Sequence, residues 1–215
     1  MEYCKKIELR KKMFLSPLTI RAQGFTLVIT LVMLIVILLL SCSLAYLALQ
    51  SERAARSGTD RLIALAAAEA ALRDAERDID PEMTGERSAI FDASSNLYFE
   101  EGCARGDGNI YQGLCLPSAS GRPPIWLSVD LAANSSDSAS VQYGRFTGQK
   151  METGRGVFTS KLPRHVIEII PDIEPGQRAD MRSKFLFRIT AIGFGSDPST
   201  QVVLQSIYRK VATSL

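Results

Sequence analysis

Hydrophobic and polar positions divide the chain into stretches of different character. From Phe25 to Leu49 no residue is charged, and the polar side chains are small hydroxyls, one thiol and Tyr46. A helix of about 25 residues at 1.5 Å per residue is about 37 Å long, enough to cross the ~30 Å hydrocarbon core of a membrane. Because a backbone in hydrocarbon must satisfy its own hydrogen bonds, residues 25–49 are predicted to form a transmembrane helix.

The helical pattern continues beyond the apolar run. Residues 50–79 are rich in Ala, Leu, Glu and Arg, which are strong helix formers. Three- and four-residue spacing predicts one apolar stripe made of Leu62, Leu65, Ala66, Leu72, Ala75 and Ile79. Charged side chains, including Asp74 and Asp78, are expected elsewhere on the helix, away from this stripe. The helix is expected to end at Asp80-Pro81, because the residue before a proline is disfavoured in the α region.

After Pro81 the pattern changes to short β-like runs separated by Gly, Pro, Ser and Asn. The predicted strands are 97–100, 125–131, 141–147, 164–170, 184–192 and 201–211. Residues 193–200 have turn chemistry, so the last two strands are predicted to form an antiparallel hairpin. Residues 101–124 and 132–140 are predicted loops. The fold class is therefore α+β, with a long N-terminal helix packed on an antiparallel sheet.

The charge distribution orients the predicted membrane helix. The chain has a net charge of +2, but residues 1–24 carry six basic and two acidic residues, so they hold +4 and the remainder −2. Basic segments beside a membrane helix stay in the cytoplasm, which leaves the C-terminal part outside. Because the basic tail is short, we interpret it as a topology signal and expect no nucleic-acid partner. The predicted organisation is a leader, a membrane helix, an amphipathic continuation and a β-rich domain: 1–24, 25–49, 50–80 and 81–215.

Two of the four cysteines are predicted to form a disulfide. Cys4 lies in the cytoplasmic tail and Cys42 in the membrane run, whereas Cys103 and Cys115 both lie in the exported part. An oxidising compartment favours their pairing, and closing this loop stabilises the fold by roughly 3 kcal/mol. A metal site is the alternative, but the cysteine spacing and a single histidine, His165, do not form a recognisable zinc ligand set.

The N-terminal region has two other interpretations. A secretory signal peptide has an apolar region of only ~7–15 residues, and the run here is far longer. A lipoprotein cleaved before Cys42 is the second, because residues 39–42 read LLSC, but Leu40 is bulky and a long apolar run precedes it. Met13 is an alternative start that would leave a shorter leader of the same character.

No catalytic constellation is found in the sequence. It contains no phosphate-binding GxxxxGK loop and no GxGxxG, GxSxG or HExxH motif. His165 is predicted to be a surface or half-buried strand residue. The carboxylates at the helix end, Asp78, Asp80 and Glu82, are interpreted as solvated charges. Residues 107–109 are interpreted as a turn, because they supply too few oxygen ligands for calcium. We therefore predict no catalytic residue, no cofactor, no metal site and no enzymatic activity.

The order of these features resembles a type IV prepilin. A short basic leader ends at Gly24, the motif Gly24-Phe25-Thr26-Leu27 follows, and the long helix leads into a β-rich domain. The resemblance implies that a prepilin peptidase cleaves between Gly24 and Phe25 and that the new amine of Phe25 is methylated. It also implies a type IV pilin-like fold.

Further segments resemble minor pilins of the PilX type. They are AAAEAALRDAE at 66–76, GLCLP at 113–117, LPRHVIE at 162–168, FRITAIG at 187–193 and VVLQSIYR at 202–209. This resemblance implies a minor pilin of a priming complex at the pilus tip, which supports twitching motility and adhesion. The implied partners are other minor pilins, the major pilin and a tip adhesin. The implied location is the inner membrane, N-terminus inside, and then the pilus.

One residue departs from the pattern of major pilins, which carry a glutamate as the fifth residue after the cleavage site. Here that position is Ile29. In the family, the carboxylate neutralises the N-terminal amine of a neighbouring subunit, since burying an unpaired ammonium is costly. A subunit without it is expected at or near the tip, where that neighbour is missing.

Two alternative functions stay open, a tip-class pseudopilin of type II secretion and a membrane-tethered periplasmic binding protein or enzyme. For a pilin, we expect the partner contact either at the final strand near 201–211 or at the Cys103–Cys115 loop. Pairing at a sheet edge is one possible mode.

Overall fold

The computed structural model describes residues 25–80, 87, 89–92, 94–154, 156–172 and 184–210. The chain divides into two compact units, residues 1–53 and 54–215. The predicted leader with Gly24, and also Glu82, lie outside the described residues.

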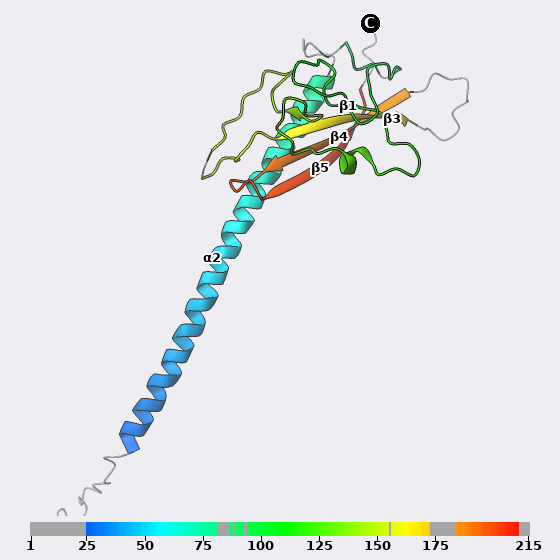
Figure 1. Ribbon diagram of the computed structural model, residues 1–215. Helices are drawn as coiled ribbons and strands as arrows, with labels where there is room; N and C mark the ends of the chain where they lie inside the picture. Colours follow the sequence, from blue (N-terminus) through cyan, green and yellow to red (C-terminus); the bar gives the residue numbers. More distant parts are fainter. Residues whose placement is uncertain are drawn as a thin grey trace, which may run out of the picture. The chain divides into compact units, whose positions relative to one another are not determined.

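Residues Phe25–Ile79 form one continuous α-helix, α2, with the bounds expected from the sequence (Figure 1). In the N-terminal unit every residue of this helix is exposed, so its apolar side chains contribute to no core. By length and composition the helix can cross a membrane. The hydroxyls of Thr30, Ser41 and Ser43 donate to helix carbonyls three or four residues earlier, which satisfies these polar groups within the apolar stretch.

The C-terminal unit contains a mixed sheet, which within the described residues has five strands. The strands are β1 (Leu114–Cys115), β2 (Val141–Gln142), β3 (Arg164–Asp172), β4 (Lys184–Phe194) and β5 (Gln201–Tyr208). The strand order is β1-β3-β4-β5, and β2 also pairs with β3. β4 runs antiparallel to both of its neighbours, β3 and β5, whereas β1 runs parallel to β3.

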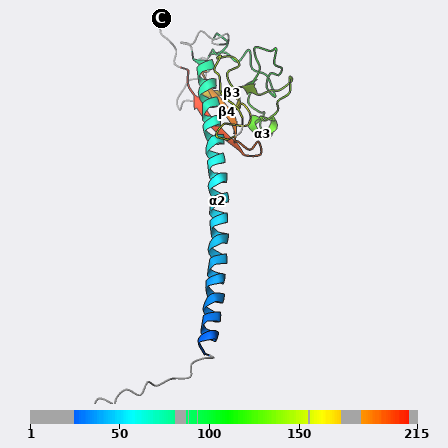
Figure 2. The same ribbon diagram turned by 90° about the vertical axis from the view of Figure 1, so that its left-hand side faces the viewer.

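Each face of the sheet has its own apolar cluster. On the first face, Ala75 and Ile79 of α2 pack with Ile167 and Ile189 of the central strands. On the second face, Ile125 packs with strand residues and with the cysteines in a second cluster. Figure 2 shows α2 and the short helix α3 (Ile125–Ser128) on either side of β3 and β4. The sheet is therefore the middle layer of the C-terminal unit.

The predicted hairpin is confirmed, and so is the strand before it. β3, β4 and β5 contain the predicted segments 164–170, 184–192 and most of 201–211. β5 ends at Tyr208, and Val211 lies outside the described residues.

The predicted strand 125–131 is wrong, because this segment begins with one helical turn. Pro124 immediately precedes α3, and the amide of Val129 donates to the carbonyl of Ile125 at 3.0 Å. A proline is tolerated at a helix N-terminus, where the backbone amides have no intrahelical partner. The turn brings Ile125 and Val129, four residues apart, into the same buried cluster.

Two other predicted strands are much shorter than expected. In 97–100 only Glu100 forms a bridge, to Cys115. In 141–147 the strand stops after Gln142, and the chain then turns around a helix carboxylate. β1 was not predicted, because a strand of two residues has no detectable period.

Candidate assembly site

The contact between α2 and the sheet is made by small residues. The buried positions of α2 include a run of alanines that face the sheet: Ala64, Ala67, Ala68, Ala71 and Ala75. A Cβ atom added at Gly193 of β4 would lie 2.1 Å from the carbonyl oxygen of Ala64 and 2.3 Å from the amide nitrogen of Ala68. Helix and strand backbones are therefore in direct contact, which only glycine opposite alanine permits. We call this contact the alanine seam.

The predicted apolar stripe on α2 is partly wrong. Leu62 is 65% exposed, and Ala66 is exposed too. Because the backbones approach so closely, the buried face is selected for small side chains and not for the most apolar ones. Leu62 instead lines an open groove of about 400 Å³, together with Val157 and Phe158.

Asp60 joins α2 to the connection between β4 and β5. Its Oδ1 accepts hydrogen bonds from the amides of Ser196 and Asp197, at 2.6 and 3.1 Å. Hydrogen bonds from the side chains of Thr200 and Ser196, with these amides, lower the pKa of Asp60 to about 2. The carboxylate is therefore ionised at neutral pH and holds the β4–β5 turn against the helix.

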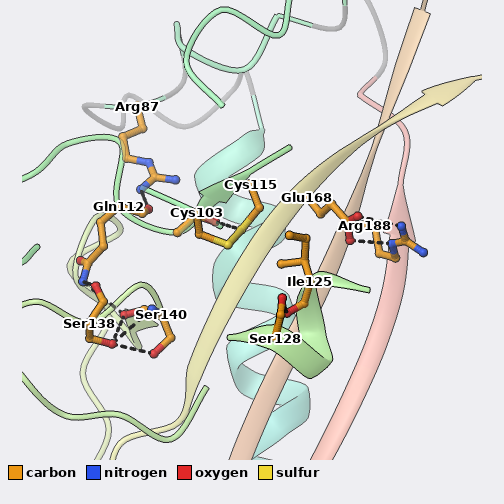
Figure 3. The surroundings of a disulfide bond; sticks show 11 residues. Arg87, Cys103, Gln112, Cys115, Ile125, Ser128, Ser138, Ser140, Glu168 and Arg188 are labelled. Atoms are coloured by element: carbon orange, nitrogen blue, oxygen red, sulfur yellow. Dashed lines mark hydrogen bonds and ion pairs between the residues drawn. A yellow bond between two sulfur atoms is a disulfide. The ribbon is translucent and has the colours of Figure 1, made fainter. Parts of the chain in front are cut away.

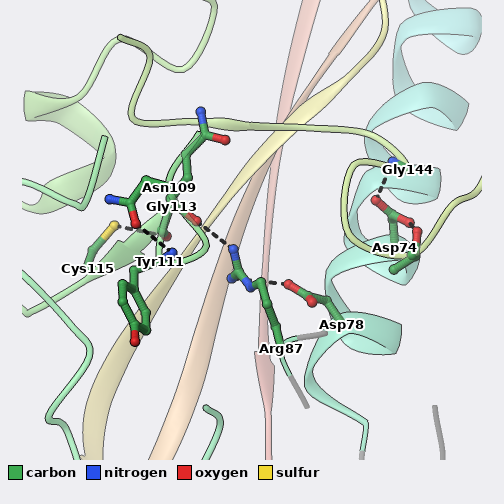
Figure 4. A network of polar contacts seen from close by, with 10 residues as sticks. Asp74, Asp78, Arg87, Asn109, Tyr111, Gly113, Cys115 and Gly144 are labelled. Atoms are coloured by element: carbon green, nitrogen blue, oxygen red, sulfur yellow. Dashed lines mark hydrogen bonds and ion pairs between the residues drawn. The ribbon is translucent and has the colours of Figure 1, made fainter. Parts of the chain in front are cut away.

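Asp74 holds the segment after β2 against α2. The prediction that Asp74 lies away from the buried face of the helix is wrong. The side chain is buried, and Oδ2 accepts the amide of Gly144 at 2.8 Å (Figure 4). The hydroxyl of Thr147 donates to Oδ1. Burial raises the pKa of Asp74, which these hydrogen bonds oppose. Gly144 has φ +75°, a conformation that favours glycine.

Asp78 is buried as well, in contact with an arginine that the sequence did not single out. The Arg87 guanidinium lies 3.1 Å from Asp78 Oδ2 and donates to the carbonyl of Gln112 at 2.7 Å (Figure 4). It also lies over the rings of Phe146 and Phe91, at 4.0 and 5.3 Å from their centroids. The interpretation of Asp78 as a solvated charge is therefore wrong.

The charges of this buried pair oppose its desolvation. Burial raises the pKa of Asp78 to about 6 and lowers that of Arg87 to about 10, and in each case the partner's charge acts in the opposite direction. At neutral pH both groups are charged. They link the end of α2 to the segment that follows it and to the loop before β1.

His165 on β3 is fully buried, so its predicted surface or half-buried position is wrong. Burial lowers its pKa to about 3, and the charges of Arg87 and Arg164 contribute further. Within the described residues neither ring nitrogen has a hydrogen-bond partner. The imidazole is therefore neutral, and it is closed off from solvent.

The predicted disulfide between Cys103 and Cys115 is present (Figure 3). Both cysteines are buried in the cluster on the sheet face opposite α2. The bond joins the 101–113 loop to β1. Beside it, Glu168 and Arg188 form a two-point ion pair across β3 and β4, with N–O distances of 2.9 and 3.0 Å. No group of three metal-ligating side chains occurs among the described residues.

The predicted processing site lies at the start of α2. Phe25 is the first residue of the helix, and Ile29 follows one turn later. Both side chains are exposed in the N-terminal unit. The anchoring carboxylates of α2 thus contact three different segments of the C-terminal unit, while Phe25 and Ile29 lie in the other unit.

Two family models match this chain. The one described as PilX N-terminal matches residues 23–73, and the one described as Type IV pilus assembly protein PilX C-term matches residues 111–210. The chain belongs to the PilX family of type IV pilus assembly proteins. Neither the curated proteins nor the solved structures gave a match.

The matched ranges contain the parts that define the fold. Residues 23–73 include Phe25, Asp60 and most of the alanine seam, and residues 111–210 include all of β1 to β5 with Gly193. In this PilX-family chain, both sides of the contact between α2 and the sheet thus lie within family-matched sequence.

Proposed function

We propose that this PilX-family chain is a minor pilin that joins the priming complex at the tip of a type IV pilus. The observation that carries the proposal is the division of α2. Its first part exposes apolar side chains on every side, while its second part is anchored to the sheet by the alanine seam and to neighbouring segments by three carboxylates. Such a helix needs a second apolar environment when it leaves the membrane, and neighbouring helices provide one.

In this function the chain is inserted in the inner membrane with its N-terminus in the cytoplasm. The six basic residues of the 1–24 segment support this orientation. Prepilin peptidase then cleaves between Gly24 and Phe25, and the amine of Phe25 is methylated. Assembly transfers the helix from lipid to a bundle of pilin helices at little hydrophobic cost, because both environments are apolar.

The partners follow from the same proposal. Other minor pilins and the major pilin contact the N-terminal helix, and a tip adhesin contacts the exported part. Ile29 supports a place at the tip, since a subunit there needs no carboxylate for the amine of a neighbour. Twitching motility and adhesion depend on the resulting pili. The chain itself carries no catalytic role.

The N-terminus of the mature protein tests this proposal most directly. Mass spectrometry of the protein isolated from sheared pili and from membranes should give a chain that starts at N-methylated Phe25. Replacing Gly24 with a bulky residue should leave the leader attached and remove the protein from pili. A wild-type protein that starts anywhere else would rule out the pilin function and favour a membrane-tethered periplasmic protein.

A pseudopilin of type II secretion is the second candidate, because Ile29 fits the tip class of both machines. Deletion of the gene distinguishes them. Loss of twitching motility with normal protein secretion supports the pilus, whereas the reverse supports the secretion system.

A further inference from the structure

β5 is an edge strand without the usual protection. In the part of the chain that the structure describes, β5 pairs only with β4. Its eight residues, QVVLQSIY, include no charged residue, no glycine and no proline. Edge strands of soluble proteins are normally blocked by charges, prolines or bulges, because their free backbone groups pair with other chains. The lack of all these devices in β5 indicates a strand kept open for pairing.

The side chains of β5 are half-buried on one face of the sheet and exposed on the other. Val202 and Leu204 pair with Gly193 and Ala191 on the sheet face that packs on α2, and they are half-buried. Val203 and Ile207 point to the other face and are 49% and 63% exposed. The layer around the disulfide therefore does not cover β5, and a neighbouring strand would shield these two residues.

We propose that the outer edge of β5, residues 201–207, binds an extended strand of another pilus subunit. This inference rests on the proposed function and identifies the surface that a partner uses. The strand that fits has β-branched or aromatic residues at alternate positions, so that they pack beside Val203 and Ile207. It lacks charge at those positions, because β5 offers none to pair with.

The geometry excludes antiparallel pairing of β5 with a second copy of this chain. Two identical edge strands that pair antiparallel in one continuous sheet are related by a two-fold axis perpendicular to that sheet. The axis reverses every direction in the plane of the sheet. α2 lies along the sheet face, from Gly193 beside Ala64 to Phe187 in the cluster of Ile79. The two helices would therefore point in opposite directions, which two chains inserted in one membrane with the same orientation cannot do.

The disulfide loop is a weaker candidate for this contact. Cys103 and Cys115 are both buried, and Cys115 is in β1, which is already paired with β3. The loop thus presents side chains but no open strand. Of the two surfaces expected from the sequence, the structure favours the final strand.

Backbone hydrogen exchange tests the proposal without any mutation. The full chain is purified in detergent, alone and after co-expression with the other pilus subunits of the same cell. In the complex, exchange of the segment 201–208 should slow by about tenfold or more, because edge amides become hydrogen-bonded. An intact complex in which this segment exchanges at the rate of the free chain would overturn the inference and leave the proposed function standing.

Matched lysine variants give an independent readout. The double variant V203K/I207K places charges on the open edge, while Leu127→Lys changes an equally exposed apolar residue (63%) on α3. The double variant should lose at least about tenfold of the co-purified subunits, and the Leu127 variant should keep them. Equal retention by both variants contradicts strand addition. If the wild-type chain itself recovers no subunit and is not cleaved at Phe25, the proposed function fails as well.

Discussion

At the scale of single residues, the anchoring of α2 depends on groups that break the usual rules of burial. Asp74 and Asp78 are carboxylates on the buried face of the helix, and Gly193 lacks a side chain in the middle of a strand. Each exception is compensated by a specific contact, to a backbone amide, to an arginine or to the helix backbone. Substitutions at these positions should therefore lower the free energy of unfolding by more than the polarity or size of the side chain alone suggests.

Gly193→Ala should destabilise the C-terminal unit by about 3 kcal/mol. The new methyl group meets backbone atoms of Ala64 and Ala68, which cannot rotate away as a side chain could, so the helix must move off the strand. The measurement is the free energy of unfolding of the purified chain in detergent. Gly58→Ala is the matched control, because nothing lies within 4 Å of that position. It should stabilise the helix by about 0.5–1 kcal/mol, and a loss of similar size in both variants would contradict the alanine seam.

His165→Leu should remove an acid sensitivity of the fold. The pKa of His165 is about 3 in the folded chain against 6.5 in the unfolded one. Below pH 6.5 the imidazole of His165 therefore binds a proton in the unfolded chain but not in the folded chain. Stability contributed by the neutral imidazole is present at pH 7.5 and is lost progressively as the pH falls towards 3. Between pH 7.5 and 5 the loss amounts to about 2 kcal/mol.

The comparison of His165→Leu with wild type isolates this effect. Asp78, with a pKa of about 6, has the opposite slope between pH 6 and 4, but it is present in both proteins and cancels in the difference. Urea unfolding at pH 7.5 and pH 5 gives that difference directly. Parallel pH dependence of the two proteins would show that the imidazole is not held neutral.

At the scale of elements, what the sequence revealed depends on the length of each pattern. α2 was predicted with its correct ends, since the uncharged run begins at Phe25 and a proline follows the amphipathic part. β4 and β5 were predicted because alternation persists over many residues around a turn. α3 and β1 were missed, because four and two residues are too short to show a period.

The rotation of α2 was not predictable from hydrophobicity. Leu62 is more apolar than Ala64, but Ala64 faces the sheet because the seam has room only for a methyl group. The regular spacing of alanines from Ala64 to Ala75 was the available signal. Arg87, which neutralises Asp78, lies in a segment without a periodic pattern, so its partner in the fold could not be inferred.

The disulfide is expected to stabilise the loop on the far face of the sheet without defining the sheet itself. Replacing Cys103 and Cys115 with alanine should lower the free energy of unfolding by roughly 3 kcal/mol, the value for closing a loop of this size. Hydrogen exchange should accelerate in 101–113 more than in β3 and β4. A reductant should destabilise the wild-type chain by a similar amount and leave the alanine variant unaffected. Uniform acceleration across all strands would contradict a local role.

At the scale of the whole molecule, the two units differ in how they bury apolar side chains. The C-terminal unit buries apolar residues in two clusters, whereas residues 25–53, the described part of the N-terminal unit, bury none. The C-terminal unit therefore has an apolar core of its own, whereas the apolar helix of the N-terminal unit needs lipid or other helices around it. In the proposed function this helix passes from lipid to other helices, and residue 29 lies in that part of it.

Ile29→Glu should change where the protein is found in the pilus. In lipid the carboxylate costs about 2.5–3.5 kcal/mol near the membrane centre, and less near its surface. In a filament it can pair with the N-terminal amine of the neighbouring subunit, which offsets the cost. By resemblance to major pilins, the variant should enter beneath existing subunits. Immunogold labelling of an exposed epitope should then shift from tips to shafts, whereas Ile29→Val should keep the wild-type labelling. If wild-type and glutamate variants both label tips alone, residue 29 does not determine the position of the subunit.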